Sequence, residues 1–136
     1  MLSNSHILVV DDNSGIRQLL YEFLTQEGFN VKVASDGFKA LQLVMEEKPK
    51  LVLLDMRMPG LSGMQTLGKL RDLAPETIVV IMSAYIDAKD IRDAVQEGRI
   101  KHFIIKPFDL VEVRTFLNDL LCGNGESIPT DLVALR

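Results

Sequence analysis

The sequence has 136 residues, of which 47% are hydrophobic and 25% are charged, with a formal net charge of −4 and a pI of about 5.1. This length fits one domain, and a domain of this size needs no disulfide or structural metal to fold. The negative charge argues against direct binding of nucleic acid, because basic residues would have to replace the phosphate counterions, and it gives no attraction to an anionic membrane.

The single cysteine, Cys122, excludes an internal disulfide and lacks the spacing of a metal site. The first apolar run, residues 7–10, is too short for a signal peptide or a membrane span. We therefore expect a soluble, cytoplasmic protein.

Five short apolar runs rich in β-branched residues predict five β-strands, at residues 7–10, 31–34, 51–54, 78–82 and 103–105. Four of these runs are apolar throughout, which is typical of strands that are buried on both faces of a parallel sheet. Lys32 interrupts the second run, as expected for a strand at the edge of the sheet.

Apolar residues at helical spacing follow each run, at residues 16–24, 38–45, 64–73, 91–95 and 110–120. Asp36 and Asp109 stand where the second and fifth helices would be capped, and Gly28 and Gly98 follow the first and fourth. This alternation predicts an α/β fold with a parallel sheet and helices on both faces. Because the pattern breaks after residue 122, we assign residues 1–122 to one domain and interpret residues 123–136 as a C-terminal tail or linker.

Polar residues follow four of the five predicted strands. Asp11 and Asp12 come after the first strand, Asp55 after the third, Ser83 after the fourth and Lys106 after the fifth. In open α/β sheets, ligands bind beyond the carboxyl ends of the strands. We therefore expect three carboxylates, a hydroxyl and an ammonium group to meet at one rim of the sheet.

Three carboxylates at one place require compensating positive charge. At about 4 Å and an effective dielectric constant of about 20, each pair repels by about 4 kcal/mol. Lys106 supplies one positive charge, and the all-oxygen ligand set favours Mg²⁺ as the source of the rest. A carboxylate beside Mg²⁺ and a lysine can attack phosphorus to form an aspartyl phosphate, and the hydroxyl of Ser83 could donate to a phosphoryl oxygen. The placement predicts a site for phosphoryl transfer.

Four segments resemble the signatures of bacterial response-regulator receiver domains: residues 7–12, 51–60, 81–85 and 104–108. The resemblance covers about residues 6–121, in the order and approximate spacing of that family. Among its subtypes, the sequence is most similar to the single-domain sporulation-phosphorelay regulators, and receivers of nitrogen-regulation-type transcription activators are nearly as similar. The resemblance implies the flavodoxin-like receiver fold, a five-stranded parallel sheet with strand order 2-1-3-4-5.

The resemblance also implies a role for each residue at the rim. Asp55 would accept a phosphoryl group from the phosphohistidine of a sensor histidine kinase. Mg²⁺ would be bound by Asp12, by Asp55 and by the backbone carbonyl of Arg57, with Asp11 acting largely through water. Lys106 would pair with the phosphoryl group.

Further residues would act on signalling and on the lifetime of the phosphate. Ser83 and Phe103 stand at the switch positions of the family, and Arg57 and Tyr85 stand where its members tune the attack of water on the aspartyl phosphate. The peptide bond between Lys106 and Pro107 would be cis. The signalling face would comprise the fourth helix, the fifth strand and the fifth helix.

The expected function is that of a phosphoacceptor in a two-component or phosphorelay system, which assists its own phosphorylation and dephosphorylation but is not an enzyme. Its partners would be a sensor histidine kinase and a downstream phosphotransferase or output protein. The alternatives are a receiver excised from a larger transcription activator, a haloacid-dehalogenase-type phosphatase and an FMN carrier. One departure from the family concerns the segment from Gly98 to Lys106, which is one residue longer than usual and carries Arg99 in place of a small residue.

Overall fold

The computed structural model describes residues 6–58, 60–84 and 89–122. Five parallel strands form one sheet in the order β2-β1-β3-β4-β5. The strands are β1 (His6–Val10), β2 (Asn30–Ala34), β3 (Leu51–Asp55), β4 (Ile78–Ser83) and β5 (His102–Ile105). The helices are α1 (Ser14–Gln26), α2 (Gly37–Glu47), α3 (Gly63–Leu73), α4 (Lys89–Gln96) and α5 (Leu110–Leu121). The predicted fold class and strand order are confirmed, and β2 lies at the sheet edge, as Lys32 indicated.

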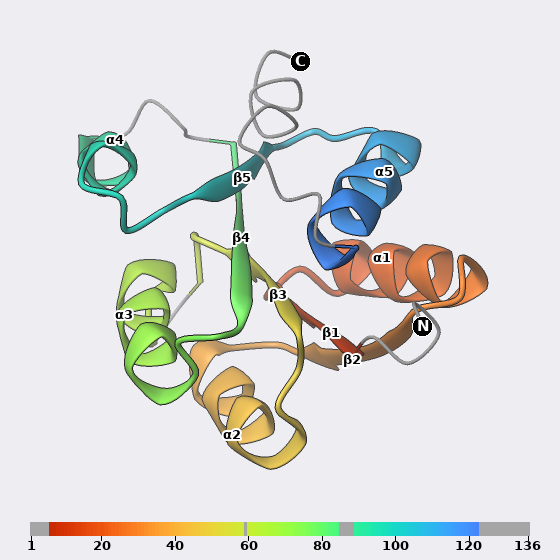
Figure 1. Ribbon diagram of the computed structural model, residues 1–136, viewed down its shortest axis with the longest axis horizontal. Helices are drawn as coiled ribbons and strands as arrows, with labels where there is room; N and C mark the ends of the chain where they lie inside the picture. Colours follow the sequence, from red (N-terminus) through yellow and green to blue (C-terminus); the bar gives the residue numbers. More distant parts are fainter. Residues whose placement is uncertain (1–5, 59, 85–88, 123–136) are drawn as a thin grey trace.

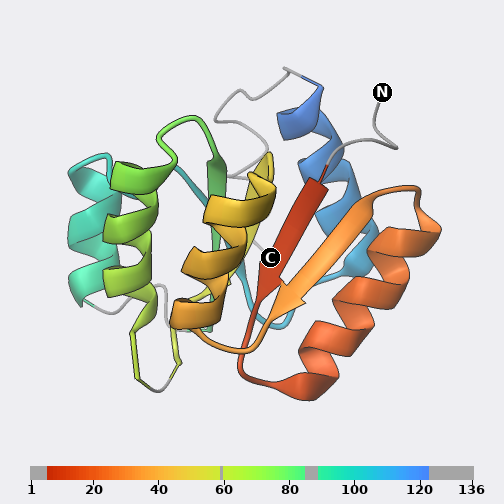
Figure 2. The same cartoon turned by 90° about the horizontal axis from the view of Figure 1, so that it is seen from below.

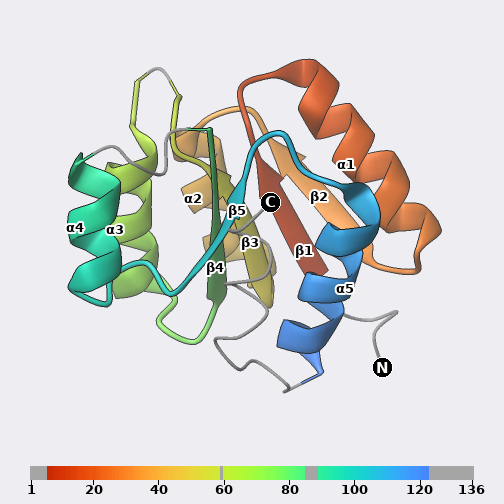
Figure 3. The ribbon, with the colours of Figure 1, turned by 90° about the horizontal axis from the view of Figure 1, so that it is seen from above.

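The helices cover both faces of the sheet. In Figure 1, α1 and α5 lie on one side of the strands, and α2, α3 and α4 lie on the other. Figures 2 and 3 show the same layers from below and from above. Because side chains alternate along a strand, Ile7 and Val9 of β1 join the core beside α1 and α5, while Leu8 and Val10 join the core on the opposite face. The central strands are therefore buried on both faces and hold the rim of the sheet rigidly.

Polar side chains cap the start of several helices. The carboxylate of Asp36 accepts a hydrogen bond from the backbone N–H of Lys39, and Asp109 caps α5 in the same way. Ser62 and Gln65 form a reciprocal capping box at the start of α3. The caps at Asp36 and Asp109 were predicted, whereas the capping box was not.

Gly63 has a different role from the one its sequence context indicates. The cluster Pro59-Gly60 and Gly63 is typical of a turn, but Gly63 is the first residue of α3. A Cβ atom at Gly63 would lie 2.5 Å from the Cα atom of Met56. The glycine is therefore required by close backbone packing at the start of a helix and not by a turn. Gly60 does take a positive φ of 73°, and Pro59 lies outside the described residues.

The lengthened segment before β5 wraps around the end of α4. The backbone N–H groups of Arg99 and Ile100 both donate to the carbonyl of Ala94, at 2.8 and 3.1 Å. Gly98 takes a positive φ of 78°, and Ile100 is buried in the core. The extra residue is thus absorbed in the turn that closes α4.

The last helix marks the end of the described domain. Helix α5 ends at Leu121 with Cys122 as its C-cap, and the predicted tail, residues 123–136, lies outside the described residues. Within the part of the chain that the structure describes, no helix has both the length and the apolar character that crossing a membrane requires.

Candidate functional site

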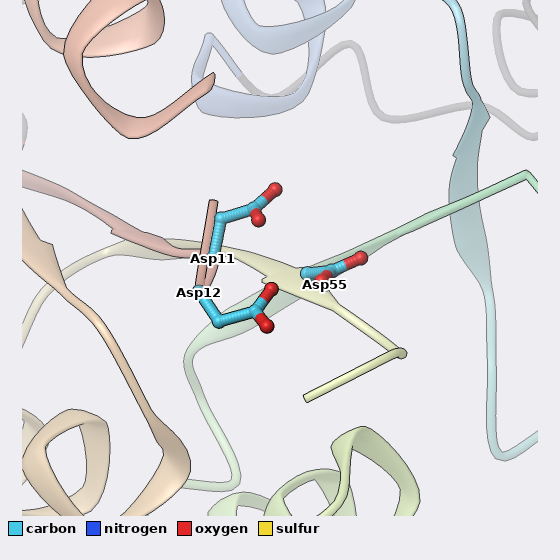
Figure 4. Close-up of side chains that lie close together, drawn as sticks. All are labelled: Asp11, Asp12 and Asp55. Carbon is cyan, nitrogen blue, oxygen red and sulfur yellow. The ribbon is translucent and has the colours of Figure 1, made fainter. Parts of the chain in front are cut away.

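Four strand ends deliver the polar residues of the site to one rim. Asp11 follows β1 directly, Asp55 and Ser83 are the last residues of β3 and β4, and Lys106 follows β5. Asp55 and Ser83 were expected just after their strands, and each instead belongs to the strand end. Figure 4 shows the side chains of Asp11, Asp12 and Asp55 on the same side of these strand ends. The structure therefore brings together the three carboxylates predicted from the sequence.

Lys106 connects two of the carboxylates. Its side-chain ammonium lies 2.9 Å from Oδ2 of Asp11 and 3.2 Å from Oδ1 of Asp55. Its backbone N–H donates to the carbonyl of Ser83 at 2.9 Å. Lys106 is thus bonded to the ends of β1, β3 and β4 at once. The peptide bond between Lys106 and Pro107, for which the resemblance implies the cis form, is cis.

Asp11 is held in place from several directions. It is completely buried, and its Oδ1 accepts a hydrogen bond from the backbone N–H of Asn13 at 2.9 Å. The guanidinium of Arg17 donates to the backbone carbonyl of Asp11 at 2.8 Å, and the Asp11 N–H donates to the carbonyl of Ala34 at 3.2 Å. Neither Asn13 nor Arg17 could be selected from the sequence, because contacts with a loop backbone leave no periodic pattern.

The electrostatics of Asp55 combine opposing effects. Burial raises the pKa of its carboxyl group, and the neighbouring charge of Asp11 raises it further. Lys106 and a hydrogen bond from the backbone N–H of Arg57 act in the opposite direction, but the pKa remains raised. Burial alone would lower the pKa of Lys106, yet Asp11 and Asp55 outweigh this effect and the pKa is raised. Lys106 is therefore a permanent cation between the two buried carboxylates.

The three carboxylates suit a hard divalent cation. One oxygen atom from each of Asp11, Asp12 and Asp55 lies within 4.8 Å of the others. Two oxygens bound to the same Mg²⁺ at about 2.0–2.1 Å lie at most about 4.2 Å apart, and Mg²⁺ keeps several of its waters. Asp12 is exposed while Asp11 and Asp55 are buried, so the group is open to solvent on one side. The bound of 4.8 Å is slightly wider than the limit of about 4.2 Å, so the group fits a partly hydrated Mg²⁺ that reaches at least one of the three carboxylates through a water molecule.

The structure describes three of the four remaining predicted residues. Ser83 is 2% exposed at the end of β4, and Arg57 is exposed. Phe103 is half-buried on β5 and packs against the core on the side of α2, α3 and α4. Tyr85 lies outside the described residues. The signalling, tuning and metal-binding roles of all these residues stay predictions.

The chain is similar to known proteins along most of its length. Residues 7–118 match the family model described as "Response regulator receiver domain". The chain is 41% identical over 113 residues to Sporulation initiation phosphotransferase F of Bacillus subtilis (strain 168), covering 83% of this chain and 90% of that protein. It is 33% identical to Regulatory protein AtoC of Escherichia coli (strain K12), where the match covers 89% of this chain but only 26% of AtoC.

Solved structures agree with these sequence matches. The receiver domain of NtrX from Brucella abortus is 34% identical with a TM-score of 0.73, and the match covers 82% of this chain and 94% of that one. A CheY-like receiver domain protein from Methanospirillum hungatei JF-1 has a TM-score of 0.83, with coverages of 88% and 95%. At 22% identity, the latter supports the fold alone. The chain belongs to the family of response regulator receiver domains, the modules of two-component and phosphorelay signalling systems.

Proposed function

We propose that Asp55 accepts a phosphoryl group from a phosphohistidine of a sensor histidine kinase. The observation that supports this most directly is the contact of Lys106 with both Asp55 and Asp11, which form one group of carboxylates with Asp12. A partly buried lysine that pairs with two buried carboxylates, beside a third that is exposed, concentrates the charges needed to hold a phosphoryl group.

In the proposed reaction, a carboxylate oxygen of Asp55 attacks the phosphorus atom, and the bond between phosphorus and the histidine nitrogen breaks. The nitrogen keeps the electron pair of the broken bond. If the other ring nitrogen carries a proton, the histidine leaves directly as neutral imidazole; if it does not, the departing imidazolate takes a proton from water. Lys106 neutralises charge on the phosphoryl oxygens, since its ammonium already lies 3.2 Å from Asp55 Oδ1. When bound by Asp12, Asp55 and the carbonyl of Arg57, with Asp11 acting through water, Mg²⁺ supplies further positive charge at the same oxygens.

Phosphorylation then changes the hydrogen bonds at the rim. It gives the Asp55 side chain a charge of about −1.5 to −2 and three acceptor oxygens. The hydroxyl of Ser83 and the ammonium of Lys106 are the proposed donors, and bonds to charged groups are worth about 1.5–3 kcal/mol each. One such hydrogen bond, if it forms only in the phosphorylated state, is enough to shift an equilibrium between two conformations about tenfold or more. The surface formed by α4, β5 and α5 is the proposed output, with Phe103 as its switch aromatic.

The comparisons support two biological contexts for this reaction. Sporulation initiation phosphotransferase F is matched over 90% of its length, which favours a role as a phosphorelay intermediate that passes the group to a downstream phosphotransferase. AtoC is matched over only 26% of its length, so a receiver that belongs to a larger transcription activator is the second candidate. In both contexts the protein acts as a phosphoacceptor that assists its own phosphorylation and dephosphorylation and does not turn over an external substrate.

The chemistry is tested by incubating the protein with Mg²⁺ and acetyl phosphate and recording its intact mass. We expect the addition of one phosphoryl group to the parent, and no addition to Asp55→Asn or without Mg²⁺. Asp36→Asn is the matched control, because Asn also caps a helix and the same charge is removed from the α2 cap instead. Equal phosphorylation of the parent and Asp55→Asn would contradict the assignment of Asp55.

The signalling step requires a separate experiment. Ser83→Ala removes one proposed donor without removing the phosphoacceptor, so phosphorylation should persist. The NMR shifts of amides in β5 and α5 that accompany phosphorylation should shrink in the variant. Thr115→Ala, which removes a hydroxyl bonded within α5, is the control. Unchanged shifts in Ser83→Ala would overturn the proposed path through Ser83.

A further inference from the structure

A cavity lies at the opposite end of the sheet from Asp55. It has a volume of about 300 Å³, and its lining includes Ile78, the first residue of β4, and His102, the first residue of β5. Strand β4 has six residues and ends at Ser83. At about 3.3 Å per residue, the cavity is separated from the phosphorylation rim by about 17 Å. The two sites are therefore distinct.

The cavity gathers positive charge on an acidic protein. Its lining contains Arg71 from the last turn of α3, and Arg99 and Lys101 from the segment before β5, against one acidic residue, Glu76. The whole chain has a formal net charge of −4. With three cations and one carboxylate in its lining, this cavity is locally positive although the whole chain is negatively charged.

Two of the three cations are held in position by the structure. Arg71 donates from Nη1 to the backbone carbonyls of Arg99 and Gly98, at 2.8 and 3.4 Å. Arg99 forms an ion pair with Glu97 at 2.8 Å. Lys101 is exposed, and among the described residues no carboxylate lies within ion-pair distance of it. Its ammonium is thus available to a ligand, beside two guanidinium groups whose places are already fixed.

The rest of the lining is mixed, with polar side chains at Thr77 and His102 and apolar side chains at the other positions. Leu67, Ala74 and Val79 contribute to the wall, together with Ile78. The volume lies at the lower end of the range of about 300–1,000 Å³ that is usual for small-molecule sites, and such sites combine apolar walls with a few convergent polar groups. Guanidinium and ammonium groups recognise phosphate and carboxylate oxygens.

We call this cavity the basic cavity, after its cations Arg71, Arg99 and Lys101. We propose that the basic cavity binds a small molecule with a phosphate or carboxylate group and a compact apolar body. Arg99 and Lys101 both belong to the connection between α4 and β5. A bound ligand would join α3 to the connection between α4 and β5.

The proposal is tested by ¹H–¹⁵N NMR titration of the full chain with three probes: phenyl phosphate, benzoate and inorganic phosphate. EDTA is present, so that no metal assists anion binding at the carboxylate rim. We expect phenyl phosphate or benzoate to shift the amides of Thr77 and Lys101 in a saturable manner, while those of Asn13 and Met56 stay in place. Binding should be tighter than that of inorganic phosphate, because the apolar wall contributes.

Two lysine variants make the test specific. Lys101→Gln should raise the dissociation constant about fivefold or more, since a charged hydrogen bond is lost. Lys69→Gln removes the same charge from an exposed position on α3 outside the lining and should leave the constant within about twofold. If all three probes bound with equal affinity, the apolar residues of the lining would not contribute to binding, and the proposed apolar body of the ligand would be wrong. Absence of saturable shifts with every probe at millimolar concentration, or equal weakening in both variants, would overturn the site.

Discussion

The ammonium of Lys106 lies 2.9 Å from a carboxylate oxygen of Asp11, although the two residues are 95 positions apart in the sequence. The side chain of Asp11 is 0% exposed and that of Lys106 is 19% exposed. A buried carboxylate is costly to desolvate unless it is paired and hydrogen-bonded, and Lys106 supplies this pairing for Asp11 and Asp55 together. The stability of the fold and the chemistry of the rim therefore depend on the same cation.

Replacement of Lys106 by Met should destabilise the protein and abolish rapid phosphorylation. Two buried carboxylates would lose their cation, and breaking a buried pair in this way costs about 3–5 kcal/mol. Urea unfolding without Mg²⁺ measures the loss, and saturating Mg²⁺ should restore part of it. Lys89→Met, which breaks the exposed pair with Asp93, is the control and should cost less than about 1 kcal/mol. Equal losses for both variants would contradict the central role of Lys106.

The raised pKa of Asp55 makes a prediction about pH. Because burial and Asp11 raise this pKa in the folded state, the folded protein retains a proton on Asp55 at pH values where the unfolded chain has lost it. The contribution of Asp55 to the free energy of unfolding should therefore fall as the pH rises from the unfolded pKa, about 3.9, through the folded one. Asp55→Asn removes this effect, so without Mg²⁺ it should be more stable than the parent above that window and lose its advantage below it. A variant that is less stable than the parent at neutral pH would refute this assignment of sign.

Arg17 should act on Mg²⁺ affinity through the position of the loop that follows β1. Its guanidinium donates to the carbonyl of Asp11, and removing such a supporting contact typically lowers metal affinity about 10–100-fold. Arg17→Met should weaken Mg²⁺ binding by at least the lower of these factors and cost about 1 kcal/mol of stability. An NMR titration with Mg²⁺ measures the affinity, and Arg92→Met on the exposed face of α4 is the control. If both variants bound Mg²⁺ as the parent does, the Arg17 contact would be irrelevant to the site.

Two glycines of α3 should respond in opposite ways to the same substitution. Gly63→Ala would place a Cβ atom 2.5 Å from the Cα atom of Met56, so it should cost about 1–3 kcal/mol. A Cβ atom at Gly68 meets nothing within 4 Å, so Gly68→Ala should stabilise the helix by about 0.5–1 kcal/mol. Thermal and urea unfolding of the two variants test the pair. The same sign of change in both would show that packing against Met56 does not decide the outcome.

Much of the fold could be predicted because its local signals agree. Apolar runs, helical spacing and the caps at Asp36 and Asp109 all point to the same alternation of strands and helices. The carboxylate group could also be anticipated, because parallel strands end at one rim and thereby bring Asp11, Asp12 and Asp55 together.

Contacts that depend on tertiary packing could not be predicted. Gly63 follows a serine, as a turn residue often does, and only its approach to the backbone of Met56 shows why no side chain fits there. Arg17 and Arg71 both donate to backbone carbonyls in loops, and such acceptors have no side-chain signature in a sequence. The basic cavity could not be predicted either, because Arg71 of α3 meets Arg99 and Lys101 only when the chain has folded.

The position of β5 in the sheet has a consequence for how such a domain can diversify. Strands β1 and β3, at whose ends the carboxylates lie, each have a neighbour on both sides, whereas among the described residues β5 pairs only with β4. A shift of β5 breaks one ladder of hydrogen bonds, while a shift of β1 or β3 breaks two. Lys106 joins this outer strand to the inner ones. Substitutions along β5 can thus change which partner protein is recognised, while the chemistry of the carboxylates at the ends of β1 and β3 stays the same.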